Sequence, residues 1–293
     1  MARNQTLRHT RAIPYQKQAV RLRWSLERIL AQLALVLLIL LVVIPFLYML
    51  RVSLASTNGY LSGPRVWAAP ITWIHYSQVW NGTNFNLFLF NSLVAAVVTT
   101  IIVVTIGSMA GFALAKVGAK FRENVMFFVL STRMGPSVVF SLPLFLFYLN
   151  LSLIDTYIGL ILVYTFYNLA FAIWLMHSFF REVPPDIEEA SLLDGLSPLG
   201  SFRHISLPLV VPGLVATAIF VFIFTWNEFF YAFVLTRQTA RTFPTMVPAF
   251  FGAYTVDWGQ MFAASVMGVI PPLVFGLLVR RYLVRGLTLG QVK

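Results

Sequence analysis

Residues 188–195 read Glu-Glu-Ala-Ser-Leu-Leu-Asp-Gly, and Ile-Ser-Leu-Pro follows at residues 205–208. This segment is acidic and rich in small side chains, and it lies in a polar gap between two long apolar runs. A membrane protein has little reason to place a helix–turn–helix between two spans unless another molecule docks there. We therefore predict a docking loop, and the alternative is an ordinary solvated helical hairpin.

The composition around this loop is that of an integral membrane protein. Hydrophobic residues make up 59% of the 293 residues and charged residues only 11%, whereas soluble domains carry about 25% charged residues. Leucine, valine, isoleucine and phenylalanine gather in blocks instead of recurring at the spacing of one helix face, which is the membrane pattern. Cysteine is absent, which excludes disulfides and thiolate metal sites.

Six apolar stretches are long enough to cross a bilayer core of about 30 Å, which takes roughly 20 helical residues. They cover residues 29–50, 87–113, 124–149, 156–178, 209–235 and 261–280. The third stretch should bend, because it contains Arg133, Gly135, Pro136 and Pro143. The sequence therefore predicts an all-α membrane protein with six transmembrane helices and a helical loop between spans 4 and 5.

We expect a single membrane domain with two short appendages. Residues 1–28 form a basic N-terminal arm, residues 29–283 form the membrane domain with its loop at 181–208, and residues 284–293 form a tail. No internal repeat or low-complexity linker divides the membrane domain.

Lys and Arg are distributed unequally between the two sides of the expected membrane. Sixteen of the 21 lie in the N-terminal arm, the 114–123 and 179–208 loops and the C-terminal region, and four lie in the opposite loops. The positive-inside rule therefore places both termini and the docking loop in the cytoplasm. Because anionic headgroups explain basic residues beside spans, the net charge of +11 does not indicate nucleic acid binding.

The local sequence predicts how the docking loop folds. Pro184 and Pro185 can open a helix, since N–H groups in the first turn lack partners in any case. Gly195 can end that helix in the left-handed conformation. Ser197 can cap a second helix that has Pro198 at its first position. The expected product is a small, rigid, L-shaped knob.

The loop resembles the cytoplasmic coupling loop of bacterial ABC-importer permeases, whose pattern is E-A-A-x3-G-x9-I-x-L-P. Ser191 replaces the second alanine with another small residue. In this family the loop sits in a cleft of a cytoplasmic ATPase subunit, and the glutamate that matches Glu189 pairs with a basic residue there. The resemblance therefore implies ATPase coupling through Glu188, Glu189, Ala190, Ser191, Asp194, Gly195, Ile205, Leu207 and Pro208.

The motor of such an importer would be supplied by other chains. This sequence has no phosphate-binding G-x-x-x-x-G-K-[ST] loop, so ATP and Mg would bind to partner ATPase subunits and no cofactor to this chain. By family resemblance, ATP binding closes two ATPase subunits, and the knobs that move with them swing the spans between inward-facing and outward-facing states.

Further segments resemble the six-span permease of the maltose-type, carbohydrate-uptake branch. They lie within residues 131–136, 155–162, 171–180, 224–229 and 285–293. The resemblance implies an inner-membrane importer with a second, different permease subunit, two ATPase subunits and an external solute-binding protein. An acidic oligosaccharide such as a uronate or alginate-type oligomer, a neutral disaccharide, a polyol and a glycerol phosphate all remain open as the substrate.

The same resemblance implies that the C-terminal tail reaches into the ATPase pair. The contact residues would be Thr288, Gly290, Gln291 and Lys293. A frayed terminus is the alternative.

Ionisable residues inside a bilayer are costly and are functional candidates. Arg133 falls near the midplane of span 3 and Glu228 near the outer end of span 5; on straight helices their depths differ by about 12 Å, too far for an ion pair. We predict that Arg133, Trp226, Asn227 and Glu228 line or gate the translocation pathway. The alternatives are that Arg133 binds backbone carbonyls and that Glu228 reaches interfacial water.

Two other functional classes fit less well. An ion-coupled secondary transporter would have repeats and several intramembrane acids, which this sequence lacks. A membrane-embedded enzyme would need clustered acids, histidines or a metal site; the four histidines are isolated and the acids gather only in the loop. We therefore predict a non-catalytic transport subunit with no catalytic and no metal-binding residues.

Overall fold

The computed structural model describes residues 15–56, 63–252 and 256–289, with side chains for residues 27–56, 66–252 and 256–279. Over these ranges the chain is helical and has no β-strand, only the isolated bridges Ala55–Ile71 and Phe251–Val256. The predicted all-α class is confirmed. The elements in chain order are α1 (Tyr15–Ser53), η1 (Gly63–Ala68), α3 (Ile74–Gly82), α4 (Phe85–Lys116), α5 (Ala119–Ser131), α6 (Ser137–Asn150), α7 (Tyr157–Arg181), α8 (Pro185–Leu193), α9 (Pro198–Ser201), η2 (Phe202–Ser206), α10 (Leu207–Leu209), α11 (Val211–Trp226), α12 (Phe230–Leu235), η3 (Phe243–Thr245), η4 (Val247–Phe250) and α13 (Trp258–Leu289).

Four helices in the described part of the chain are long and apolar enough to cross a membrane. They are Glu27–Ser53 within α1, all of α4 and α7, and Trp258–Val279 within α13. A fifth span is formed if α11 is joined to Pro198–Leu209, which it meets at 79°. The protein is thus a multi-span membrane protein, and the exact count of six spans stays a prediction.

The helices predicted over 124–149 and 209–235 are each divided in two. In the first, α5 ends at Ser131 and α6 begins at Ser137; the bend expected there lies at the Gly135–Pro136 pair, because proline has no N–H to continue the helix. At 13 and 14 residues, each half covers only about 20 Å. The second break, between α11 and α12, contains no proline or glycine and is a correction to the sequence prediction.

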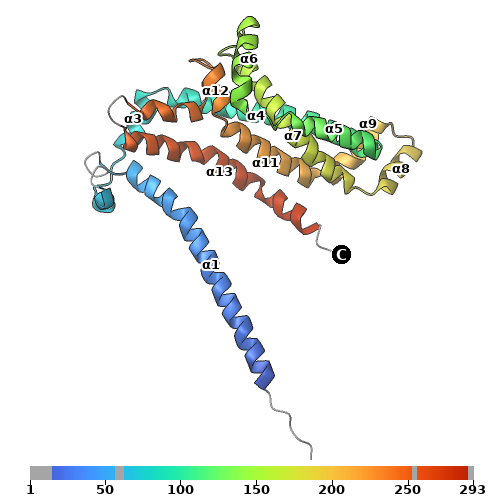
Figure 1. Ribbon diagram of the computed structural model, residues 1–293, viewed down its shortest axis with the longest axis horizontal. Helices are drawn as coiled ribbons and strands as arrows, with labels where there is room; N and C mark the ends of the chain where they lie inside the picture. Colours follow the sequence, from blue (N-terminus) through green and yellow to red (C-terminus); the bar gives the residue numbers. More distant parts are fainter. Residues whose placement is uncertain (1–14, 57–62, 253–255, 290–293) are drawn as a thin grey trace, which may run out of the picture.

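Helices α4 and α7 form the tightly packed centre of the molecule, with α11 on both and α13 against α11 (Figure 1). A Cβ atom added at Gly107 would lie 2.8 Å from the Ala172 Cβ, and one at Gly111 would lie 2.7 Å from the His177 backbone nitrogen. Only glycine permits this approach. Close contact is what holds helices together in lipid, where the hydrophobic effect does not.

Helix α1 stands away from this centre and touches it mainly through α13 (Figure 1). It runs without interruption from Tyr15 to Ser53, so it crosses the boundary at residue 28 predicted between arm and span, and Pro45 lies inside it. None of its apolar window is buried within the chain. A helix that is apolar on all sides is suited to a hydrocarbon environment.

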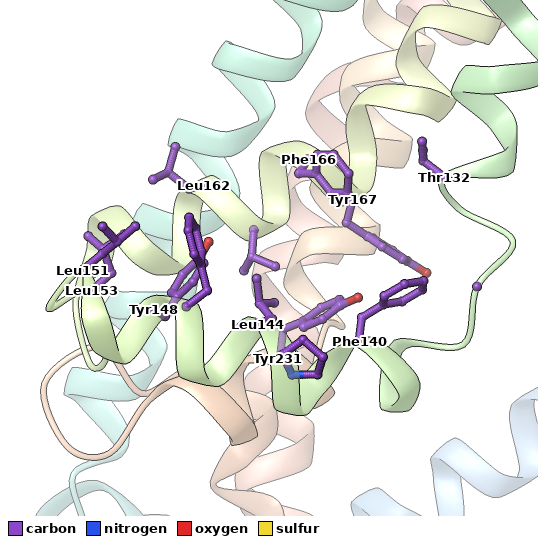
Figure 2. A pocket seen from close by; sticks show the side chains of 14 residues that line it. Thr132, Phe140, Leu144, Tyr148, Leu151, Leu153, Leu162, Phe166, Tyr167 and Tyr231 are labelled. Carbon is purple, nitrogen blue, oxygen red and sulfur yellow. The ribbon is translucent and has the colours of Figure 1, made fainter.

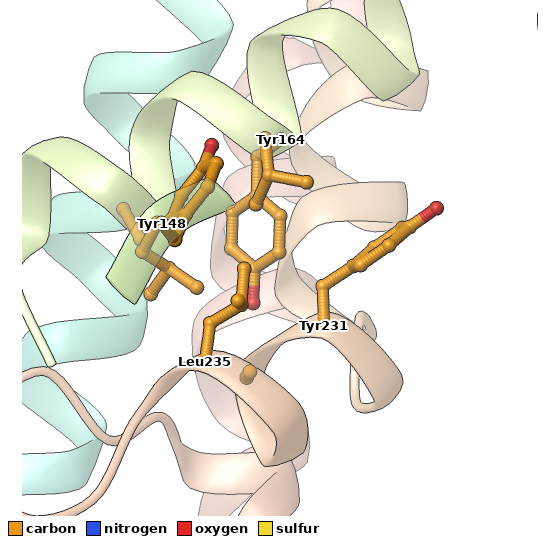
Figure 3. Packing of buried hydrophobic residues seen from close by; sticks show 8 residues of the cluster. Tyr148, Tyr164, Tyr231 and Leu235 are labelled. Carbon is orange, nitrogen blue, oxygen red and sulfur yellow. The ribbon is translucent and has the colours of Figure 1, made fainter. Parts of the chain in front are cut away.

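At the end of α7 away from α8, aromatic packing joins three helices. Tyr148 of α6, Tyr164 of α7, and Tyr231 and Leu235 of α12 form one buried cluster (Figure 3). The cluster fixes the short helix α12 against the central pair.

Beside this cluster, Asp155 anchors the loop that follows α12. Its carboxylate accepts the backbone N–H groups of residues 237–240 at 2.9–3.2 Å. Asn91 of α4 donates to the carbonyl oxygens of Thr239 and Arg241, both at 2.8 Å, and Tyr157 donates to the Asn91 side-chain oxygen. Together these residues form a polar tie between α4, the α6–α7 turn and the loop after α12.

The charge of Asp155 matters to this tie. Partial burial alone would raise the pKa of Asp155, but the four N–H groups outweigh it and lower the pKa from 3.8 to about 2. Because the folded-state pKa is depressed, the stabilisation is complete above the unfolded value and is lost as the pH falls from about 4 toward 2.

We predict that Asp155→Asn lowers the free energy of unfolding by on the order of 2 kcal/mol, because the neutral amide turns donors toward four N–H groups. Thermal unfolding of the detergent-solubilised protein at pH 7 measures this effect. Asp194→Asn, on an exposed loop, is the matched control and should change stability by less than about 0.5 kcal/mol. Equal midpoints for the two variants would contradict the role given to the tie.

Candidate functional site

The docking loop folds largely as the sequence predicts. Helix α8 begins at Pro185 after Pro184, and Gly195 has a φ of +91°, in the left-handed region. The Ser197 hydroxyl accepts the Gly200 N–H at 3.1 Å and caps α9, whose first residue is Pro198. The π-helical turn η2 and the short helix α10 then lead into α11 through the 79° bend at residue 210.

One face of the loop is exposed. Glu189, Ala190, Asp194 and Gly195 are exposed, and Leu193 is 88% exposed. An apolar side chain this exposed, next to Asp194 and one helical turn after Glu189, is the kind of surface that a partner covers.

Glu188 and Ser191 lie on the opposite face, 4% and 5% exposed, so they are not part of the exposed surface, and their predicted part in ATPase coupling stays a prediction. Residues three apart in a helix share one face, and in α8 that face packs inward against the rest of the loop. Of the remaining predicted positions, Ile205 and Leu207 are half-buried and Pro208 is exposed.

A polar network holds this inner face. The Glu188 carboxylate forms an ion pair with Lys116, the last residue of α4, and accepts the Ser206 hydroxyl at 2.7 Å. The Ser191 hydroxyl lies 2.7 Å from both the Glu188 carbonyl oxygen and the Ser201 hydroxyl. The knob is thus closed on itself and attached to the end of α4.

Aromatic rings form the base on which the loop rests. The rings of Phe112, Phe180 and Phe202, from α4, α7 and η2, have centroids 5.0–6.0 Å apart, in a cluster with Met176 and Val210. A cavity of about 490 Å³ lies between this base and α8, with Lys116 and Glu188 in its lining.

Sequence reasoning missed the part that Lys116 plays. It counted Lys116 only as one of the basic residues that orient the chain. A usable signal was present, because a lysine that ends an apolar span lies on the same side of the membrane as the acidic loop.

The second predicted group meets at the α5–α6 break. Arg133, Asn227 and Glu228 line one cavity of about 480 Å³. The Arg133 guanidinium lies over the rings of Tyr167, Phe171 and Phe224, with its central carbon 4.8, 5.5 and 5.0 Å from the centroids.

Arg133 and Glu228 form no ion pair although they share this cavity, in agreement with the depth argument from the sequence. The Glu228 carboxylate instead accepts the N–H groups of Tyr231 and Ala232, at 2.9 and 3.3 Å, in the first turn of α12. The acid that breaks the apolar run therefore satisfies backbone donors that the break exposes.

Trp226 does not join this group. Its ring is buried and stacks on Phe222, and its indole N–H donates to the Gly268 carbonyl of α13 at 3.2 Å. This large ring, on the last residue of α11, is accommodated in the α11–α13 interface, and its predicted place on the pathway stays a prediction.

The predicted tail contacts are largely outside the described residues. Thr288 belongs to the backbone of α13, but its side chain is not described, and Gly290, Gln291 and Lys293 lie outside the described residues. Helix α13 continues to Leu289, beyond the predicted start of the tail at residue 284.

A larger cavity, of about 750 Å³, opens between α6, α7 and α12 (Figure 2). Its lining includes the rings of Phe140, Tyr148, Phe166, Tyr167 and Tyr231 and contains no charged side chain. It contrasts with the cavity at Arg133, which carries two charges.

Comparisons with known proteins agree with this architecture. The model of the family described as "Binding-protein-dependent transport system inner membrane component" matches residues 103–288. The trehalose/maltose transport system permease of Thermococcus litoralis is 34% identical over 92% of this chain and 98% of its own length. The trehalose transport system permease of Mycobacterium tuberculosis is 36% identical over 85% of this chain and 92% of its own length.

Chains from solved ABC transporters also superpose on this protein. A chain from a bacterial ABC transporter that imports the acidic polysaccharide alginate superposes with a TM-score of 0.72 at 25% identity, covering 88% of this chain and 96% of that chain. A chain from a bacterial alginate ABC transporter in complex with its alginate pentasaccharide-bound periplasmic protein superposes with a TM-score of 0.66, covering 89% and 94%; at 16% identity it supports the fold alone.

We predict that reversing either charge of the Lys116–Glu188 pair destabilises the loop and that reversing both restores it. Removing one partner of a fully buried pair costs about 3–5 kcal/mol. Because the Lys116 side chain is 44% exposed, we expect on the order of 2 kcal/mol for Lys116→Glu or Glu188→Lys.

Thermal unfolding and limited proteolysis of the loop in the two single variants and the double variant measure this coupling. Asp194→Lys, a charge reversal at an exposed position of the same loop outside this cavity, is the control. Additive losses in the double variant would show that the pair does not hold the loop.

Proposed function

Because the chain belongs to the family of binding-protein-dependent transport system inner membrane components, we propose that it is the permease subunit of an ATP-driven carbohydrate importer. In this proposal the substrate arrives on an external solute-binding protein and crosses by alternating access. The observation that carries the proposal is the exposed knob fixed to the end of the central helix pair.

The carbohydrate assignment rests on the relatives. Two permeases that are similar over most of this chain are named for trehalose or maltose transport, and one solved neighbour belongs to an importer of an acidic polysaccharide. Sugars differ widely among these proteins, so the class transfers and the individual sugar does not.

The mechanism follows from how the knob is attached. Glu189, Ala190, Leu193 and Asp194 present the surface that docks into a partner ATPase subunit, where ATP and Mg bind. The Lys116–Glu188 pair, with the Phe112 ring beneath it, transmits movement of the docked knob to α4. Because α4 packs closely on α7, the two helices move together in this mechanism. In the proposed importer the chain itself catalyses no reaction, and ATP is hydrolysed by the partner subunits.

The proposed assembly follows the family. It contains a second, different permease, two ATPase subunits and the external binding protein, all at the bacterial inner membrane, with both termini cytoplasmic. The C-terminal end of α13 and the residues after it would contact the ATPase pair.

The absence of cysteine permits a direct test. We expect Ala190→Cys, on the exposed face, to cross-link in native membranes to a co-expressed ATPase encoded beside this gene, and ATP with vanadate to change the yield. Ser191→Cys, one residue away and buried, is the matched control and should give at most a small fraction of that yield. Mass spectrometry identifies the captured chain.

Failure of both variants to capture a nucleotide-binding chain, with folded protein in the membrane, would overturn the coupling role. Equal capture at both positions would contradict the inward orientation of Ser191.

A further inference from the structure

Arg133 occupies a distinctive position in the molecule. It lies in the break between α5 and α6. There the backbone N–H groups of Arg133 and Met134 donate to the carbonyl oxygens of Leu130 and Ser131, both at 3.1 Å. The break turns its side chain against α7 and α11, over the faces of Tyr167, Phe171 and Phe224. Three ring faces attract the cation and hold it at one place in the cavity.

The ring contacts leave the hydrogen-bonding capacity of the guanidinium unused. Among the described residues, no carboxylate lies within ion-pairing distance of Arg133, and its side chain donates no hydrogen bond. Rings attract a cation through their faces and accept no strong N–H bond, whereas a guanidinium has five N–H donors in a planar fork. A charge with unused donors inside a membrane protein calls for an anionic partner.

The nearest acid in the cavity does not fill that need. Both oxygens of Glu228 are bound to backbone N–H groups of α12, and α12 is fixed by the Tyr164 cluster. The partner of Arg133 must therefore come from outside the described chain.

The remainder of the lining suits a hydroxylated ring. Asn227 donates one N–H to the Ile223 carbonyl at 2.8 Å, which leaves its side-chain oxygen and second N–H available. Ser137 supplies a hydroxyl, and Phe229 and Phe230, which do not hold the guanidinium, supply apolar surface. A volume of about 480 Å³ lies within the range of about 300–1,000 Å³ usual for small-molecule sites.

We propose that this cavity is a substrate subsite for an acidic sugar, in which the Arg133 fork binds the carboxylate of a uronate residue. Guanidinium and carboxylate match in planar, two-point geometry, while Asn227 and Ser137 bind ring hydroxyls and the aromatic faces pack on the sugar. The subsite selects for charge during translocation, and a neutral sugar leaves the fork without a partner. The proposal rests on the function proposed above.

The test compares two ligands with the same sugar backbone, one with carboxylates and one with neutral methyl ester groups. Trigalacturonate and its methyl ester are titrated by calorimetry into the detergent-purified importer, assembled from this chain and its co-expressed partners without the external binding protein. We expect trigalacturonate to bind at least about tenfold more tightly than the ester, the difference expected for a charge-assisted two-point contact.

Variants assign the preference to the side chain. Arg133→Met should abolish the preference while leaving ester binding within about threefold, and Arg133→Lys should retain part of it because the charge remains but the fork is lost. Arg237→Met is the matched control, since Arg237 also lies over one ring, Phe145, with its central carbon 5.7 Å from the centroid, but outside this cavity.

The possible results distinguish failure of the proposed subsite from failure of the proposed importer function. Cross-linking at Ala190 reports the assembly and should be retained in Arg133→Met, while basal ATP hydrolysis should be normal in the Arg237→Met control. Equal binding of acid and ester, no binding of trigalacturonate at millimolar concentration, or a preference that survives in Arg133→Met would overturn the subsite while leaving the importer function standing. Loss of basal ATP hydrolysis and of assembly in Arg133→Met and Arg133→Lys alike would assign Arg133 to the structure and would also overturn the subsite.

Discussion

The close contact of α4 and α7 is the constraint on which the rest of the molecule depends. At Gly107 and Gly111 the two backbones approach so nearly that a single added Cβ atom would collide with Ala172 or His177. In hydrocarbon, contact of this kind replaces the hydrophobic effect as the force between helices. The pair is therefore the closely packed unit against which α11, α12 and the docking loop are placed.

Polar ties are found at both ends of this unit. At one end Asp155 and Asn91 hold the loop that follows α12; at the other, Lys116 holds Glu188 in the knob. The apolar middle of the pair is held by close packing, and its two ends are held by hydrogen bonds and an ion pair. Charged side chains and backbone groups without intrahelical partners are tolerated mainly where the helices end. In the function proposed above, α4 carries a movement of the knob to the opposite end of the molecule.

Two helix breaks bring polar side chains to positions inside the molecule that an unbroken helix would not reach. Arg133 lies within the α5–α6 break and Glu228 within the α11–α12 break, so both belong to backbone that has left the helix. Glu228 compensates for the freed N–H groups of α12, whereas Arg133 is held by rings alone. Irregular backbone costs stability in lipid. Here it also creates a cavity in which the Glu228 carboxylate has hydrogen-bond partners and the Arg133 guanidinium has none among the described residues.

The sequence by itself determined the membrane class, most of the spans, the boundaries and caps of α8 and α9, and the family, because these depend on local composition and on spacing within one segment. It also located the α5–α6 break, since Gly135 and Pro136 act on their own backbone. Only the tertiary structure decided that Glu188 and Ser191 point inward, that Trp226 is buried beside Gly268, and that Lys116 and Asp155 tie distant segments. Those outcomes depend on which faces of different helices meet, and that is settled by packing between residues far apart in the chain.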